Sequence, residues 1–223
     1  MKAMRVVMLG ASGAVGSAAL AELLAMPEIA QVTALVRRPL DGVSSPKLAV
    51  DSVDVTKPAS YAALLAGHDV ALCTFGVGQP TKVSKVEFTA IDYDAVLDFA
   101  KACRAAGVQQ FTLLGSVAAD PRSRSFYLRS KGQLREAIAG LGFARFSCFQ
   151  PSVLITPRNR YGLSQAVVLA LWPGLSRLML GPARRYRGIR VEDLGKAMAR
   201  HLAKPGAGNA VLHWDDFQAL LRP

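Results

Sequence analysis

The chain has 223 residues, of which 51% are hydrophobic, and its formal net charge at pH 7 is +11. This length and composition predict a full hydrophobic core and a chain that folds unaided. The basic residues are spread along the sequence and form no motif interleaved with aromatic residues, so we expect no nucleic-acid partner. No uninterrupted apolar run is long enough to cross a bilayer, and we expect a cytoplasmic protein with no membrane span.

Cysteine and histidine give no sign of a metal site, because neither residue type shows metal-ligand spacing. The three cysteines, Cys73, Cys103 and Cys148, lie far apart within apolar segments. They are expected to be buried thiols in a reducing compartment. The three histidines are equally scattered, so metal catalysis is disfavoured.

Apolar segments typical of strands alternate with helical segments along the first two thirds of the chain. Strands are expected at residues 5–9, 31–36, about 48–53, 69–74, 110–115 and 143–149. Helices are expected at residues 14–26, 58–66, 86–106 and 124–140. Because the strands are apolar throughout, they should lie in a sheet that is covered on both faces. The predicted fold class is α/β, with a doubly wound parallel sheet of the Rossmann-like type.

The strand at 5–9 runs directly into a glycine-rich turn, Gly10-Ala-Ser-Gly13-Ala-Val-Gly16, that opens the helix at 14–26. The start of a helix presents unpaired N–H groups and the positive end of its dipole, so it can hold a pyrophosphate. Gly10 allows a sharp turn, Gly13 a close approach to the phosphates, and Gly16 tight packing on the sheet. We therefore predict that a dinucleotide is bound by Gly10, Ser12, Gly13, Ala14, Val15 and Gly16.

The end of the second strand indicates which dinucleotide is bound. In this fold an acid at that point binds the ribose 2'-hydroxyl of NAD, whereas arginine pairs with the 2'-phosphate of NADP. The strand at 31–36 is followed by Arg37 and Arg38, and no acid is present there. The sequence therefore predicts NADP(H) as the cofactor. The alternative is that both arginines are simply exposed at the end of a strand.

Two further strand ends should face the cofactor. Asp54 and Val55 follow the third strand, where the adenine edge should pass and the carboxylate of Asp54 could accept a hydrogen bond from the exocyclic amine. A helix N-cap role for Asp54 or Thr56 is the alternative. Thr74-Phe75-Gly76 closes the fourth strand with a second glycine-rich turn. We expect that turn to pass under the ribose and the nicotinamide.

The candidate chemistry lies after the fifth strand. That strand leads to Ser116, and the next helix carries Tyr127 and Lys131, which lie four residues apart on one helical face. An ammonium close to a phenol favours release of the phenolic proton, so Tyr127 is a candidate proton donor. Ser116 would hold the substrate oxygen, and the hydride would come from the nicotinamide. The alternative is a tyrosine and a lysine that merely share a helix surface.

These motifs, in this order, resemble the short-chain dehydrogenase/reductase superfamily, in particular its extended and atypical branches. Phe126-Tyr127-Leu128 and Phe146-Ser-Cys-Phe-Gln-Pro151 are more narrowly similar to the Tat-interacting-protein oxidoreductase group, whose members bind NADPH. The resemblance covers most of residues 4–155 and implies a seven-stranded sheet, with Tyr127 as the acid and Lys131 as its ribose-binding partner. It also implies that the nicotinamide is lined by Pro151, Ser152 and Val153.

Two family features have no clear counterpart. Thr74-Phe75-Gly76 stands where many catalytic members carry an Asn-Ala-Gly turn, and residues 87–98 hold no evident match for the asparagine that classical members carry in the central helix. After Pro151 the pattern is less regular. A helix is expected near 163–171, then an arginine-rich loop, a helix at 192–203, and a strand and helix within 209–221. We expect an NADP-binding Rossmann domain at residues 1–155 and a small substrate-side lobe at 156–223 that completes the same domain.

The leading functional prediction is an NADPH-dependent oxidoreductase that reduces a small carbonyl or quinone-like substrate. Retention of the serine, tyrosine and lysine favours this enzyme. The missing asparagines favour an alternative, an NADPH-binding redox sensor that acts through a protein partner with little turnover. A nucleotide-sugar epimerase-like enzyme is the third alternative, and the short stretch after Pro151 disfavours it. A homodimer or another protein partner is left open.

Overall fold

The computed structural model describes residues 3–77, 82–156 and 179–222. Its centre is a seven-stranded sheet with the strand order β3-β2-β1-β4-β5-β6-β9, and every pairing in it is parallel. The strands are β1 (Met4–Leu9), β2 (Ile29–Val36), β3 (Leu48–Ser52), β4 (Val70–Cys73), β5 (Gln110–Leu114), β6 (Arg145–Phe149) and β9 (Gly208–Leu212). The predicted doubly wound parallel sheet and its seven strands are confirmed.

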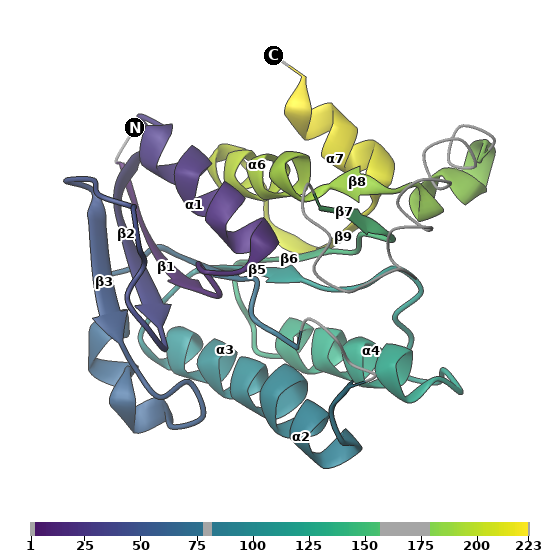
Figure 1. Ribbon diagram of the computed structural model, residues 1–223, viewed down its shortest axis with the longest axis horizontal. Helices are drawn as coiled ribbons and strands as arrows, with labels where there is room; N and C mark the ends of the chain where they lie inside the picture. Colours follow the sequence, from purple (N-terminus) through teal and green to yellow (C-terminus); the bar gives the residue numbers. More distant parts are fainter. Residues whose placement is uncertain (1–2, 78–81, 157–178, 223) are drawn as a thin grey trace.

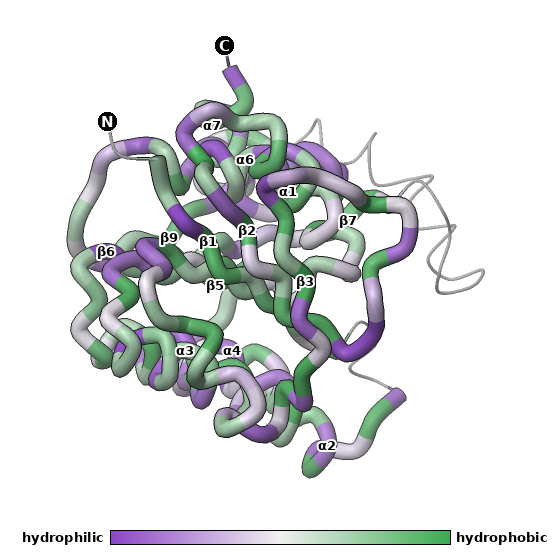
Figure 2. The backbone as a smooth tube through the Cα atoms, turned by 90° about the vertical axis from the view of Figure 1, so that its left-hand side faces the viewer, coloured by the Kyte–Doolittle hydropathy of each residue, from purple (hydrophilic) through white to green (hydrophobic). Residues whose placement is uncertain are grey.

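Helices cover both faces of the sheet (Figure 1). One face carries α1 (Ala14–Ala25), α6 (Val191–Ala203) and α7 (Trp214–Leu221). The other carries α2 (Lys85–Thr89), the π-helical turn η4 (Ala90–Asp94), α3 (Ala95–Ala105) and α4 (Phe126–Ala139). Figure 2 shows mostly hydrophobic strands between helices of alternating hydropathy. The core therefore consists of two apolar clusters, one on each side of the sheet.

Some predicted elements are replaced by tighter turns. The helix expected at 58–66 is two 3₁₀ turns, η1 (Pro58–Ser60) and η2 (Ala62–Leu65). Tyr61 between them has a non-helical backbone, with φ −133° and ψ −8°, and its buried ring packs edge-on against Phe99. A continuous helix would not place that ring in the core. The arginine-rich loop contains a further 3₁₀ helix, η5 (Gly181–Tyr186), and the helix expected near 163–171 lies outside the described residues.

The last described segment is built into the sheet and the helix layer above it. β9 pairs with β6 from Arg145↔Gly208 to Phe149↔Leu212. Helix α6 crosses α1 so closely that a Cβ on Gly195 would lie 2.6 Å from the backbone nitrogen of Ala19. A small two-stranded ladder joins β7 (Leu154–Ile155) to β8 (Ile189–Arg190). Within the described part of the chain, none of the helices combines the length and apolar character needed to cross a membrane.

A buried polar network fixes the end of α6 to the start of β6. The guanidinium of Arg145 donates to the backbone oxygens of His201 and Lys204, at 3.2 and 2.5 Å, and to Nε2 of His201 at 2.7 Å. Both Arg145 and His201 are 7% exposed. Burial, and the positive charge of Arg145, lower the pKa of His201 to about 4. His201 is therefore neutral in the folded protein at neutral pH.

Candidate functional site

A cavity of about 140 Å³ lies at the carboxyl ends of β1, β2 and β4. In open parallel sheets, ligands bind at these strand ends where the strand order reverses. The cavity brings together many of the residues that the sequence predicts for the cofactor. These are Gly10, Ser12, Gly13, Arg37, Val55, Thr74, Phe75 and Gly76.

The glycine turn is held so tightly that side chains would not fit. Gly10 has φ +96°, and a Cβ there would come within 2.6 Å of the backbone nitrogen of Phe75. A Cβ on Gly16 would collide with the carbonyl oxygen of Gly10, to which the hydroxyl of Thr74 donates at 3.1 Å. Helix α1 begins after Gly13 without a side-chain cap. The backbone N–H groups of its first turn, which includes Ala14 and Val15, can therefore serve an anion.

The two predicted phosphate-binding arginines lie in different positions. The guanidinium carbon of Arg37 lies 5.9 Å from the centroid of the Phe75 ring, so the end of β2 reaches across the cavity toward the end of β4. Arg38 is also exposed but is not among the residues that line the cavity. Arg37 is therefore the arginine closer to the glycine turn.

The carboxylate of Asp54 is occupied by its own turn. Oδ1 accepts hydrogen bonds from the hydroxyl and the backbone N–H of Thr56, at 2.7 and 3.1 Å, and Nζ of Lys57 lies 3.1 Å from Oδ2. The hydrogen bonds from Thr56 lower the pKa of Asp54. These contacts hold Asp54 within its own turn, and the helix N-cap role does not fit either, because the 3₁₀ turn at Pro58–Ser60 has Lys57 as its N-cap and no side-chain cap. Val55, which is buried, lines the cavity instead.

The second part of the site is a buried ion pair between Lys131 of α4 and Asp92 of η4. Nζ of Lys131 lies 2.5 Å from Oδ1 of Asp92, and the two side chains are 9% and 2% exposed. The other carboxylate oxygen accepts the backbone N–H of Val77 at 2.6 Å. A Cβ on Gly76 would lie 2.7 Å from Oδ1. Asp92 therefore fixes Lys131 and the turn after β4 at the same time.

Sequence reasoning missed Asp92. The sequence predicts one helix at 86–106, whereas the structure has the π-helical turn η4 at Ala90–Asp94 within that segment. Such a turn changes which side chains face inward, and π-helical turns occur frequently at functional sites. An acid within the apolar run Ala90-Ile91-Asp92-Tyr93 was the available signal. The central helix thus supplies a polar partner for Lys131 that the comparison with classical members did not reveal.

Tyr127 lies beside Lys131, as the four-residue spacing predicts. Nζ of Lys131 is 6.0 Å from the centroid of the Tyr127 ring and 5.9 Å from that of Phe88. The rings of Phe88 and Tyr127 pack edge-on, with centroids 5.8 Å apart. Tyr127 is half-buried, so its ring is positioned by packing while part of it stays accessible.

Ser116 and the segment after β6 meet at the next two strand ends. The backbone N–H of Val117 donates to the carbonyl oxygen of Pro151 at 2.9 Å, which ties the turn after Ser116 to Pro151. Ala118 in that turn has φ +58°, a conformation that residues other than glycine rarely adopt. Val153 accepts a hydrogen bond from Ile189 at 3.0 Å, whereas Ser152 is half-buried beside it.

Thiol chemistry is disfavoured at these strand ends. All three cysteines are free and buried, as the sequence predicts. Burial raises the pKa of both Cys73, at the end of β4, and Cys148, in β6, to about 12. Their thiols therefore stay protonated at neutral pH and are poor nucleophiles.

The two parts of the site are continuous. Thr74-Phe75-Gly76 lines the cavity at the glycine turn, and the following residue, Val77, is hydrogen-bonded to Asp92. A ligand that extends from α1 along the ends of β1 and β4 would therefore reach Lys131 and Tyr127. This arrangement suits a long ligand that has its anionic part at the glycine turn and its reactive end near α4.

Comparison with known proteins identifies the family. A family model described as NAD(P)H-binding matches residues 10–141. Protein HTATIP2 of Rattus norvegicus is 32% identical over 209 residues, which cover 93% of this chain and 84% of the rat protein. The mitochondrial protein FMP52 of Meyerozyma guilliermondii is 34% identical over 162 residues, which cover 70% of this chain and 67% of the relative.

Solved structures agree in fold. The oxidoreductase ylbE from Lactococcus lactis has a TM-score of 0.68 at 16% identity, with 98% of this chain and 97% of the other covered. MoeE5 in complex with UDP-glucose and NAD has a TM-score of 0.71 at 20% identity, with 93% of this chain and 75% of the MoeE5 chain covered. The chain therefore belongs to the NAD(P)H-binding family and is similar to HTATIP2.

Proposed function

We propose that the protein is an NADPH-dependent oxidoreductase that reduces a small carbonyl or quinone-like compound. The observation that carries the proposal is the position of Tyr127 and Lys131 on one side of α4, with Lys131 fixed by Asp92 beside the turn that lines the glycine cavity. The cofactor fits the chain, because the turn at Gly10 and Gly16 leaves no room for a Cβ and α1 begins uncapped.

Each residue has a role in this reaction. NADPH, when bound, supplies the hydride that adds to the carbonyl carbon. The hydroxyl of Tyr127 delivers the proton to the carbonyl oxygen, and Ser116 orients that oxygen by a hydrogen bond. Lys131, whose ammonium lies beside the Tyr127 ring, binds the ribose. Asp92 is a positioning residue that holds Lys131 in place.

Preference for NADPH rests on Arg37 and Arg38. A 2'-phosphate beside these guanidinium groups would form charge-assisted hydrogen bonds that NADH cannot form. We expect NADPH to raise the melting temperature far more than NADH does, and the double variant Arg37→Ala/Arg38→Ala to lose this difference. Arg122→Ala/Arg124→Ala, which removes two exposed arginines from another loop, is the matched control. An equal response of the parent protein to both nucleotides would refute the specificity argument.

The role of Tyr127 is tested by removing only its hydroxyl. Tyr127→Phe keeps the ring that packs on Phe88, so NADPH affinity should stay nearly intact while NADPH oxidation stops. Binding by calorimetry and turnover by absorbance at the nicotinamide band measure the two effects separately. Unchanged turnover in this variant would remove Tyr127 from the mechanism.

A redox-sensing protein with little turnover is the second candidate function. The Asp92–Lys131 pair favours it, because a carboxylate 2.5 Å from the ammonium offsets the charge that would assist Tyr127. A cofactor-consumption screen with aldehydes, ketones and quinones separates the two candidates. Turnover supports the reductase, whereas NADPH binding without any turnover supports the sensor.

The compartment is a separate question. The sequence predicts a cytoplasmic protein, whereas the name of the FMP52 relative assigns that protein to mitochondria. We propose the cytoplasm, and fluorescence microscopy of the tagged chain checks this assignment. Co-localisation with a mitochondrial marker would reject it.

A further inference from the structure

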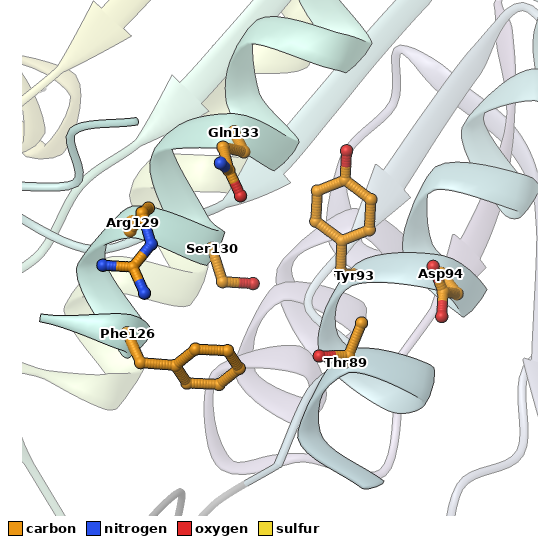
Figure 3. Close-up of a pocket in the computed structure, with 7 residues that line it drawn as sticks. All are labelled: Thr89, Tyr93, Asp94, Phe126, Arg129, Ser130 and Gln133. Atoms are coloured by element: carbon orange, nitrogen blue, oxygen red, sulfur yellow. The ribbon is translucent and has the colours of Figure 1, made fainter. Parts of the chain in front are cut away.

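A second cavity, of about 310 Å³, lies between α4 and the helical segment formed by α2 and η4. Figure 3 shows the ring of Phe126 and the hydroxyl groups of Ser130 and Thr89 directed toward the space between the helices, with the ring of Tyr93 forming the opposite wall. The amide of Gln133 lies one turn further along α4. This volume is at the lower end of the range for small-molecule sites.

The second cavity lies back to back with the proposed catalytic residues. The same backbone segments present one side chain to the cavity and the adjacent one to the reaction site. The three adjacent pairs are Phe126 with Tyr127, Ser130 with Lys131, and Tyr93 with Asp92. Movement of either helix at the cavity therefore moves Tyr127, Lys131 or Asp92 directly.

Phe88 contacts one residue of each site, Phe126 of the cavity and Tyr127 of the reaction site. It is 2% exposed, and its ring centroid lies 5.6 Å from that of Phe126 and 5.8 Å from that of Tyr127. Nζ of Lys131 lies 5.9 Å from the centroid of the same ring. Because protein interiors are close-packed, displacement of Phe126 by an occupant is transmitted through Phe88 to Tyr127 and Lys131.

The π-helical turn η4 contributes one residue to each of the two sites. Tyr93 and Asp92 both belong to η4, and a register shift between a π and an α turn changes the direction of adjacent side chains. In the present arrangement Asp92 faces Lys131, and Tyr93 faces the cavity. An occupant that contacts Tyr93 therefore acts on the same backbone turn that holds Asp92 against Lys131.

We propose that this cavity binds a small neutral aromatic compound with one hydrogen-bonding substituent, and that its occupancy changes the geometry of Asp92 and Lys131. The rings of Phe126 and Tyr93 suit a planar apolar body, and the hydroxyl groups suit one polar substituent. The charges in the wall are balanced, with Arg129 opposed by Asp94, and the Arg129 guanidinium donates to the backbone oxygen of Ser123 at 2.7 Å. The regulatory half of this proposal rests on the proposed function, whereas the binding half does not.

The binding half is tested with 4-fluorophenol and no nucleotide. Ligand-observed fluorine NMR should give saturable binding with a Kd on the order of 1 mM, as expected for a ligand of this size. Gln133→Trp places a bulky side chain at the cavity and should weaken binding at least tenfold. Glu136→Trp, at an exposed position on the same helix outside the cavity, should leave it unchanged. Absence of saturable binding, or binding that survives Gln133→Trp, would overturn the proposal.

The regulatory half is tested by the coupling between ligands. If occupancy moves Lys131, 4-fluorophenol must change NADPH affinity, and NADPH must change 4-fluorophenol affinity by the same factor. We expect at least a twofold change by calorimetry in the parent protein and in Glu136→Trp, and none in Gln133→Trp. Binding of both ligands without coupling would overturn the regulatory half. Failure of NADPH to bind would instead count against the proposed function, because the fluorine NMR titration needs no nucleotide.

Discussion

Replacement of Asp92 by asparagine should destabilise the protein although the two side chains have nearly the same shape. The carboxylate accepts from two donors, Nζ of Lys131 at 2.5 Å and the backbone N–H of Val77 at 2.6 Å. An amide has only one acceptor oxygen, so one of these donors would face an N–H group. Breaking a buried ion pair from one side costs about 3–5 kcal/mol, and because the amide keeps one acceptor oxygen, we expect a loss of about 3 kcal/mol for this variant. For a chain of this size that corresponds to a fall in melting temperature of about 6–12 °C.

The assay is thermal unfolding followed by circular dichroism, with a double variant as the control. Asp92→Asn/Lys131→Met removes both charges and leaves the amide oxygen to accept the backbone N–H of Val77, so no buried donor loses its acceptor. The double variant should therefore melt closer to the parent protein than Asp92→Asn does, and the cycle with Lys131→Met gives the coupling between the two residues. The buried pair would be refuted if Asp92→Asn lowered the melting temperature by less than about 2 °C. It would also be refuted if the double variant melted at a lower temperature than Asp92→Asn.

Three other predictions concern stability and the glycine turn. The unfolded chain protonates His201 near pH 6.5, and the folded one only near pH 4, so stability is full above pH 6.5 and falls as the pH is lowered. The free energy of unfolding, measured by urea titration, should fall by about 2 kcal/mol between pH 8 and pH 5, and this fall should be absent in His201→Gln. The same pH dependence of the unfolding free energy in both proteins would contradict this prediction. Gly16→Ala should abolish nucleotide binding by calorimetry, whereas Gly140→Ala, where a Cβ meets only ordinary contacts, should bind normally. Tyr61→Phe should leave the melting temperature unchanged or higher, because the buried hydroxyl has no partner among the described residues; a fall of several degrees would reveal one.

The sheet was predictable because its strands are short apolar runs that end at glycines or polar residues. Leu9 is followed by Gly10 and Cys73 by Thr74, and the structure ends β1 and β4 there. The glycine turn was predictable for the same local reason, since the steric need for glycine at Gly10 and Gly16 is a property of a few neighbouring residues. Local sequence therefore fixes which segments form strands and where the phosphate-binding turn lies.

The remaining features depend on contacts between distant segments. The partner of Lys131 is 39 residues away in sequence and lies in a π-helical turn. The two turns that replace the helix expected at 58–66 meet at Tyr61, whose side chain is buried in the core. Neither feature has a periodic pattern in the sequence, because each is set by tertiary packing.

The crossing of α6 over α1 has a consequence for biosynthesis. Helix α1 leaves the ribosome early, but the Gly195 surface that covers it is translated on the order of ten seconds later. During that interval the part of α1 that Gly195 later contacts, at Val15, Ala18 and Ala19, lacks its cover. The nascent chain should therefore be a client of holdase chaperones until α6 docks.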